Sequence, residues 1–276
     1  MILFDLHHLA YRAAYAHPYL SHNGKLTGVA FGVIGEIKSC IDRLEDTNVV
    51  IACDSPTSKR KEIFPSYKNR PLKTEDDRKA KELMIEQIND LKSNIFPRMG
   101  VCNVFEYDGY EADDILAEIV MRRNWVARPV IVTGDEDIFQ LLDHADIWMS
   151  NKQKMWTNKK FENHYKIPVA GWVEYKTLAG CTSDTVPGVS GVGPVYAIQH
   201  IKNELKPGKI MNFITEAKND GTYEKMQLLV KLPFPKTPIS TIRKTNFDKE
   251  AFLEICDEYG FNSFKRNVCE WAVIFK

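Results

Sequence analysis

Tyr110-Glu111-Ala112-Asp113-Asp114-Ile115-Leu116 is a stretch with three carboxylates within four residues, and an apolar run at helical spacing follows it directly. The pattern predicts the first turn of a helix, where the positive end of the helix dipole stabilises acidic side chains. Glu111 and Asp114 lie three positions apart, so both can reach one point on the same helical face. Converging carboxylates repel one another unless a cation lies between them, and oxygen-only clusters suit magnesium or manganese. For this stretch alone, a polar helix N-terminus without a cation is the alternative.

Apolar runs that end in acidic residues recur through the first half of the chain. Buried strands are expected at 1–6, 48–52, 101–106, 129–133 and 147–150, alternating with helices at 10–16, 28–44 and 138–142. This alternation predicts an α/β fold with a doubly wound, mostly parallel sheet and helices on both faces. Ligands of such sheets bind at the carboxyl ends of the strands. Asp5, Asp54, the 111–114 stretch, Asp135 and Asp137 all fall at that edge, which predicts a shared metal site.

Basic residues interrupt this alternation between residues 55 and 100. The stretch Ser58-Lys59-Arg60-Lys61 is followed by Tyr67-Lys68-Asn69-Arg70-Pro71, and Thr74-Glu75-Asp76-Asp77 has the pattern of a capping box that begins a helix. That helix carries Arg78, Lys79 and Lys81 early. Basic side chains with an interleaved tyrosine suit a phosphate backbone with occasional base stacking. A solvated surface helix is the alternative for Lys79 and Lys81, and it explains Lys68 and Arg70 less well.

Helical segments dominate after about residue 152, and a glycine-rich loop separates two of them. Helices are expected at 169–178, 194–205, 207–217, 223–230 and 249–259. The loop between the first two contains Gly188, Gly191 and Gly193. Exposed backbone amides beside a helix N-terminus bind phosphate without reading base sequence. A plain turn between two helices is the alternative.

Composition limits the classes of protein to which the chain can belong. Of its 276 residues 44% are hydrophobic, enough for a buried core, and no apolar run has the length of a membrane span. The N-terminus lacks a signal-peptide pattern, and six scattered cysteines without a Cys-x-x-Cys pair favour a reducing cytoplasm over structural zinc. The 37 basic residues equal the 37 acidic ones, although nucleic-acid binders are usually basic. Gathering acids at a metal site would leave the remaining surface basic.

Taken together, these motifs resemble the 5′ nuclease (flap endonuclease) family, above all the stand-alone bacteriophage 5′-3′ exonucleases and the 5′ nuclease domain of bacterial DNA polymerase I. The resemblance covers nearly the whole chain. It implies a PIN-like metal-binding core at 1–165 with a helical arch at about 59–95. It also implies a helical DNA-binding region at 166–276 with a helix–three-turn–helix element at about 169–205. Its motifs are Phe4-Asp5, Asp54, Tyr67-Lys68-Asn69-Arg70, Glu111-Ala112-Asp113-Asp114, Thr133-Gly134-Asp135-Glu136-Asp137, Asp184 with the loop 187–193, and the stretch 259–264.

The resemblance implies a metal-dependent 5′→3′ exonuclease and flap endonuclease that acts in replication. Two ions, Mg²⁺ or Mn²⁺, would activate water and stabilise the leaving oxygen. The first would be held by Asp5, Asp54, Glu111 and Asp113, with Asp114 shared or behind them, and the second by Asp135, Asp137 and Asp184. Catalysis would involve Lys68 at the scissile phosphate, with Arg70 and Asp114 assisting.

The implied substrates are 5′ flaps, nicks and duplexes with a 5′ single strand, with RNA–DNA hybrids as a further class. A potassium ion is implied at the carbonyls of the 188–193 loop. A free-standing monomer without membrane contact is expected, in the host cytoplasm if the source is a phage. The residues expected to bind DNA are Tyr67, Lys68, Arg70, Arg78, Lys81, Gly188, Gly191 and Gly193.

Two positions depart from the family pattern. The family usually has Gly-Asp-x-x-Asp before the glycine loop, and here Cys181 replaces the first aspartate. A thiol is a poor ligand for magnesium, so the second metal site is expected to be weak or to prefer manganese. The lysine motif is one residue shorter than the family's Tyr-Lys-x-Asn-Arg, which leaves the place of Arg70 open.

Three other interpretations of the sequence stay open. Cys181 motivates a structure-specific DNA-binding protein with weakened catalysis, although the other intact carboxylates argue against it. A Toprim-like fold would leave Asp5, Asp54 and the glycine loop unexplained. A phosphatase of the haloacid type would need Thr or Val after its Asp-x-Asp, and here Ile138 follows.

Overall fold

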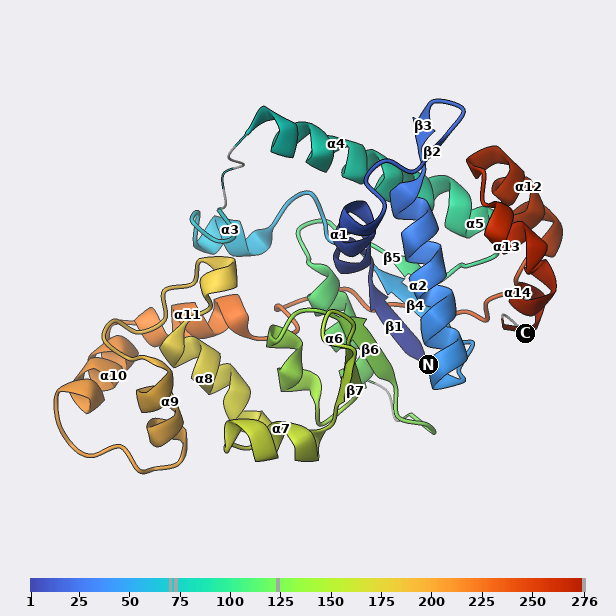
Figure 1. Cartoon of the computed structure of the whole chain (residues 1–276). Helices are drawn as coiled ribbons and strands as arrows, with labels where there is room; N and C mark the ends of the chain where they lie inside the picture. Colours follow the sequence, from blue (N-terminus) through green and yellow to red (C-terminus); the bar gives the residue numbers. More distant parts are fainter. Residues whose placement is uncertain (70, 72–73, 123–124, 275–276) are drawn as a thin grey trace.

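A six-stranded sheet forms the centre of the computed structural model, which describes residues 1–69, 71, 74–122 and 125–274 (Figure 1). Its order is β5-β4-β1-β6-β7-β8. All neighbours are parallel except β8, which pairs antiparallel with β7. This confirms the predicted mostly parallel α/β sheet, whereas β8 and the hairpin of β2 and β3 were not expected. The strands are β1 (Ile2–Asp5), β2 (Ser21–His22), β3 (Lys25–Leu26), β4 (Val49–Ala52), β5 (Val104–Phe105), β6 (Val130–Thr133), β7 (Asp146–Met149) and β8 (Lys154–Trp156).

The strand order reverses direction between β1 and β6. From β1 the chain moves outward to β4 and β5, and it then returns to the other side of β1 to form β6, β7 and β8. Loops that leave the carboxyl ends at such a switch point diverge and leave a crevice for ligands. The register pairs Asp5 with Ala52 and Phe4 with Val132. Asp54 and Asp135 therefore emerge on either side of Asp5.

Helices cover both faces of the sheet because alternate strand residues point to opposite sides. Phe4, Ile51 and Val132 belong to one apolar cluster, and Leu3 and Ile131 belong to the other. Burial on both faces explains why these strands are continuous apolar runs in the sequence. The first cluster includes residues of α1 (Leu6–Ala16), α2 (Gly28–Leu44) and α4 (Glu75–Asp90). The second includes α6 (Ala112–Arg122), the 3-10 helix η2 (Asp137–Leu141), α7 (Asn158–Tyr165) and the start of α8 (Trp172–Ala179).

The helices after β8 occupy two different places. A group on the left of Figure 1 consists of α8, α9 (Pro194–Ile201), α10 (Lys209–Asn219) and α11 (Thr222–Val230). By contrast, α12 (Lys249–Tyr259), α13 (Asn262–Arg266) and α14 (Val268–Ile274) return to the sheet, where Phe252 and Trp271 join the same cluster as α2. The last helices of the region expected at 166–276 therefore lie with the core, and the boundary at residue 165 stays a prediction. None of the described helices is long and apolar enough to cross a membrane.

The interruption between β4 and β5 is helical, as the sequence indicates. It contains α3 (Lys59–Ile63), α4, the π-helix η1 (Leu91–Ile95) and α5 (Phe96–Arg98). Thr74 caps α4 in the predicted capping box with Asp77. The second half of α4 is anchored through Met84 and Ile88, whereas its first half is exposed and extends away from the sheet (Figure 1).

Candidate active site

Acidic side chains gather at the carboxyl edge of the sheet, around the switch point. Asp5 ends β1 and caps α1 by accepting a hydrogen bond of 3.0 Å from the His8 amide. Asp54 follows β4 and accepts one of 2.8 Å from the Ala112 amide at the start of α6. Both residues thus serve as helix caps. Capping does not account for the whole group, because Asp113 and Asp135 interact electrostatically with Asp5 at the same place.

Burial and mutual repulsion raise the pKa values of these carboxyl groups. Burial raises the pKa of Asp5 to about 7, with a further contribution from Asp54. Burial, followed by repulsion from Asp137, raises the pKa of Asp135 to about 6. The pKa of Asp113 lies well above its usual range, first because of burial and then because of Asp135 and Asp5. A divalent cation among these groups would reverse the effect by favouring their ionised forms.

The clearest sign of a ligand is one oxygen atom of Asp113. Oδ1 of Asp113 is buried and has no hydrogen-bond partner among the residues that the structure describes. Buried polar atoms are almost always paired, so such an atom points to a missing ion or water. Carboxylate oxygens are the ligands that Mg²⁺ and Mn²⁺ prefer. The residues at this centre therefore fit a divalent ion held by Asp5, Asp54, Glu111 and Asp113, with Asp135 beside them.

Glu111 and Asp114 converge, as their spacing predicts, but they converge on an arginine. Both Asp114 oxygens lie 2.7 Å from the Arg60 guanidinium, and Glu111 Oε2 lies 3.5 Å from Arg60 Nη1. Asp114 is fully buried and also accepts from the amides of Glu111 and Phe234. Because its oxygens are bound by protein donors, Asp114 fits the expected position behind the metal ligands rather than that of a shared ligand, and its part in catalysis stays a prediction. Its carboxylate instead joins α6 to α3.

Tyr67 and Lys68 lie at the carboxylates, with different consequences for DNA. Tyr67 is only 2% exposed, and its hydroxyl donates to Glu111 over 3.0 Å and to Asp184 over 3.4 Å. The expected stacking of Tyr67 on DNA is therefore corrected, since its ring is packed among apolar residues. Lys68 Nζ lies 3.1 Å from Glu111 Oε2, and a third of its side chain is exposed. Although burial alone would lower it, the pKa of Lys68 is held well above its usual range by Glu111 and Asp184.

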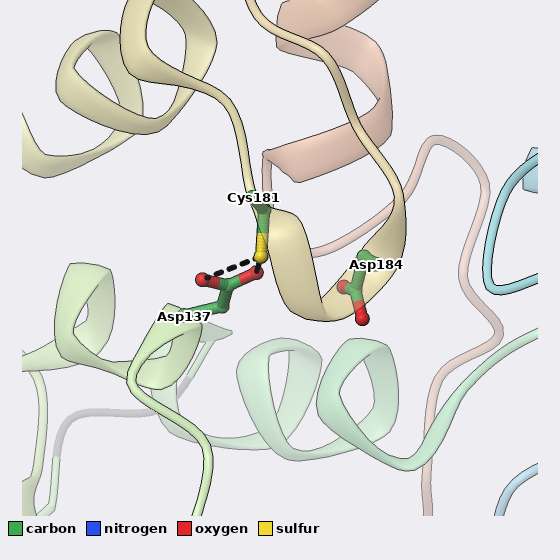
Figure 2. Close-up of side chains that lie close together, drawn as sticks. All are labelled: Asp137, Cys181 and Asp184. Atoms are coloured by element: carbon green, nitrogen blue, oxygen red, sulfur yellow. Dashed lines mark hydrogen bonds between the residues drawn. The ribbon is translucent and has the colours of Figure 1, made fainter. Parts of the chain in front are cut away.

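A second group of candidate ligands consists of Asp137, Cys181 and Asp184. One ligand atom of each lies within 4.8 Å of the others. Figure 2 shows the Cys181 side chain pointing at Asp137, where Sγ lies 3.4 Å from Oδ2. Burial, followed by the nearby Asp137 carboxylate, raises the pKa of the Cys181 thiol to about 11. The residue that departs from the family pattern thus faces the acidic group as a neutral thiol.

The arch and the glycine loop carry the remaining residues that are expected to contact DNA. Arg78 and Lys81 are exposed on the first half of α4, and Arg70 lies outside the described residues. Gly188 approaches Gly180 so closely that a Cβ would lie 2.5 Å from its nitrogen, and a Cβ on Gly191 would lie 2.6 Å from the Phe213 ring. Gly188 thus lets the loop pack against the end of α8 and Gly191 lets it pack against α10, while a Cβ on Gly193 would meet open space. The potassium ion expected at 188–193 stays a prediction.

Two basic residues of the site were missed by sequence reasoning. Arg60 appears in the sequence only as one of several basic residues of the arch, yet it is 2% exposed and bound to Asp114. Lys176, in the middle of α8, has its Nζ 2.5 Å from Asp137 Oδ1. A surplus of buried carboxylates indicates that some cations must be present. Nothing in the spacing shows which basic residues supply them.

Comparisons with known proteins agree with this geometry. Residues 1–166 match the family described as 5′-3′ exonuclease, N-terminal resolvase-like domain. DNA polymerase I from Thermus filiformis is 27% identical over 228 residues, which cover 82% of this chain and 26% of that protein. The chain thus spans about a quarter of that relative's length.

Solved structures share the fold along nearly the whole chain. A bacteriophage T5 flap endonuclease, in a complex with DNA and metal ions, matches with a TM-score of 0.69 and 19% identity over 98% of both chains. Flap endonuclease-1 from Methanococcus jannaschii matches with a TM-score of 0.62 and 13% identity, over 99% of this chain and 92% of that one. With the match over residues 1–166, the sheet order and the carboxylates at its switch point, the chain belongs to the 5′-3′ exonuclease family with an N-terminal resolvase-like domain.

Proposed function

We propose that this chain is a divalent-metal-dependent 5′ nuclease that hydrolyses phosphodiesters near the 5′ end of branched or nicked DNA. The observation that carries the proposal is the unpartnered buried Oδ1 of Asp113 among carboxyl groups with raised pKa values. Mg²⁺ or Mn²⁺ at this centre would lower the pKa of an attacking water and offset charge on the phosphate. Processing of RNA–DNA hybrids, action as a monomer and a cytoplasmic location are further predictions of the proposal.

Several residues of the chain would act on the substrate directly. The Lys68 ammonium lies beside Glu111 with a third of its side chain exposed, so it can reach a phosphate that enters the carboxylate centre. A fixed positive charge there would stabilise the negative charge that develops in the transition state. Exposed Arg78 and Lys81 on α4 would guide a single strand, and the 188–193 loop would hold the duplex through its backbone. DNA binding without catalysis is the less favoured function, because the carboxylates of the first centre are intact.

A cleavage assay with a 5′-labelled flap tests the proposal. The flap should be cut near its junction in Mg²⁺ or Mn²⁺, and it should stay intact in EDTA. A blunt duplex of the same sequence is the matched substrate and should be cut far more slowly. Equal cleavage of both substrates, or cleavage that persists in EDTA, would contradict the proposal.

Lys68→Ala is expected to lower the single-turnover rate of flap cleavage by about 10²-fold to 10³-fold while DNA affinity changes little. The reason is that its ammonium is placed to stabilise charge that appears only in the transition state. Lys81→Ala is the matched control, since Lys81 is exposed on α4 and should affect affinity rather than rate. Equal losses in rate and affinity for Lys68→Ala would show that the residue is only a phosphate anchor.

Gly193→Asp is expected to weaken binding to every duplex by about tenfold without destabilising the protein. Gly193 has an ordinary φ of −91° and precedes α9, and an added Cβ would meet open space. Aspartate is a favourable residue at this capping position, so its charge would act on phosphate rather than on folding. Gly193→Asn, which caps without charge, is the control. An affinity loss that depends on DNA sequence, or that the asparagine variant shares, would rule out phosphate contact.

A further inference from the structure

In the second group of carboxylates, all four oxygens of Asp137 and Asp184 lie near a protein donor or cation. Asp137 Oδ1 lies 2.5 Å from Lys176 Nζ, and Oδ2 accepts from the Cys181 thiol over 3.4 Å. Asp184 Oδ2 accepts from the Tyr67 hydroxyl over 3.4 Å, and Oδ1 lies 4.0 Å from Lys68 Nζ. By contrast, Asp113 Oδ1 in the first centre has no partner among the described residues. Among the residues that the structure describes, the first centre thus has a buried carboxylate oxygen without a partner and the second does not.

Lys176 is held at this place by its surroundings. Its side chain is 13% exposed, and its ammonium lies 4.0 Å from Cys181 Sγ and 5.3 Å from the centre of the Trp172 ring. A lysine ammonium is protonated at neutral pH, and this one lies 2.5 Å from the Asp137 carboxylate. A divalent ion between Asp137 and Asp184 would have to displace this ammonium or tolerate its repulsion.

Cys181 removes the charge that would otherwise attract a further ion. Its Sγ lies 3.4 Å from Asp137 Oδ2 and donates to that oxygen as a thiol. An aspartate at this position would bring a third carboxylate to the group. Three carboxylates beside one ammonium would carry a net negative charge, which would attract another cation. With the thiol in place, Asp137 pairs directly with Lys176, whereas Asp184 lies 4.0 Å from Lys68, a lysine that also pairs with Glu111. The chemistry of these residues therefore does not fit a second Mg²⁺ ion.

We propose that the Lys176 ammonium takes the place of the second divalent ion, so that the protein binds one ion at the Asp5–Asp113 centre and supplies its other cation from α8. This inference rests on the proposed nuclease function, but the number of bound ions can be measured without DNA. In this arrangement Lys176 acts as a positioning residue that holds Asp137 beside Cys181 and Asp184.

Titration of each protein with Mn²⁺ alone tests the inference, with free Mn²⁺ followed by electron paramagnetic resonance. The wild type should bind one Mn²⁺ per chain tightly. Lys176→Met removes the charge at similar length and should bind a second Mn²⁺ at least tenfold more tightly than the wild type does. The double variant Lys176→Met with Cys181→Asp should bind that second ion more tightly still.

Two control variants sharpen the result. Lys176→Arg keeps a cation and should retain a stoichiometry of one. Lys152→Met removes an exposed lysine that pairs with the neighbouring Glu136, and it should also bind one ion. Two sites of comparable affinity in the wild type, or one site in both the single and the double variant, would overturn the inference. A wild type that binds one ion but fails to cut a flap would overturn the nuclease function instead.

Discussion

Asp113→Asn is expected to lower the rate of flap cleavage by on the order of 10³-fold, measured in single turnover with saturating Mg²⁺. The substitution replaces the carboxylate whose Oδ1 is buried without a partner, and a neutral amide is a much poorer ligand for a hard cation. DNA affinity should change far less, because Asp113 is half-buried among other acids rather than placed on an exposed basic surface. Asp76→Asn, on the exposed part of α4, is the control and should keep the wild-type rate.

The same variant should stabilise the metal-free protein at high pH. The folded-state pKa of Asp5 is raised to about 7 and that of Asp113 lies well above its usual range, so the folded protein binds more protons than the unfolded chain does. These raised pKa values therefore contribute most to the stability of the metal-free wild type below about pH 4. That contribution is lost as the pH rises toward 7 and beyond. Removing one of the repelling charges should raise the melting temperature at pH 8 in EDTA. A lower melting temperature would show that Asp113 is mainly structural.

Arg60→Met is expected to lower the free energy of unfolding by about 3–5 kcal/mol, measured by urea denaturation. The Asp114 carboxylate is fully buried, and its bidentate partner would be lost. A buried charge left without its partner is among the most destabilising changes known for single residues. Because Arg60 Nε also donates to the Leu229 carbonyl over 2.9 Å, α3 should lose its attachment to the end of α11 as well.

Two further variants distinguish the contribution of the Arg60–Asp114 ion pair to stability from that of side-chain packing. Combining Arg60→Met with Asp114→Asn should recover part of the lost stability, since the unpaired charge is removed. Arg98→Met breaks a half-exposed pair with Glu258 and should cost about 1 kcal/mol or less. If Arg60→Met is no more destabilising than Arg98→Met, the Arg60–Asp114 pair contributes little to stability.

The sheet could be predicted from the sequence because its signals are local. Val49–Ala52 is apolar throughout and Val130–Thr133 is apolar up to its last residue, and an acid follows each strand two positions later, at Asp54 and Asp135. Helix α2 has the predicted bounds, because its apolar residues recur at helical spacing. The strand expected at 101–106 is only Val104–Phe105, and the helix expected at 138–142 is a 3-10 turn. In these two short segments, tertiary contacts rather than periodicity determine the backbone.

The partners of the acidic residues could not be predicted, because they come from distant parts of the chain. Asp114 pairs with Arg60 across 54 positions, and Asp137 pairs with Lys176 across 39. The sequence places carboxylates at strand ends, since each strand end is a local feature. It does not show which basic side chain the fold brings to each of them, and for that reason it could not separate Asp114 from its neighbours.

The return of the last helices to the sheet has a consequence for how the chain folds during synthesis. Trp271 packs beside Ile34, Ile37 and Val49, so residues from both ends of the chain share one apolar layer. Contacts between such distant segments form late, because closing a long loop costs entropy before any contact repays it. While a ribosome still holds the last helices, the face of α2 that they cover is open to water and to other nascent chains. The apolar layer is thus expected to close only after these last helices have left the ribosome, and chaperones would bind the chain first at α2.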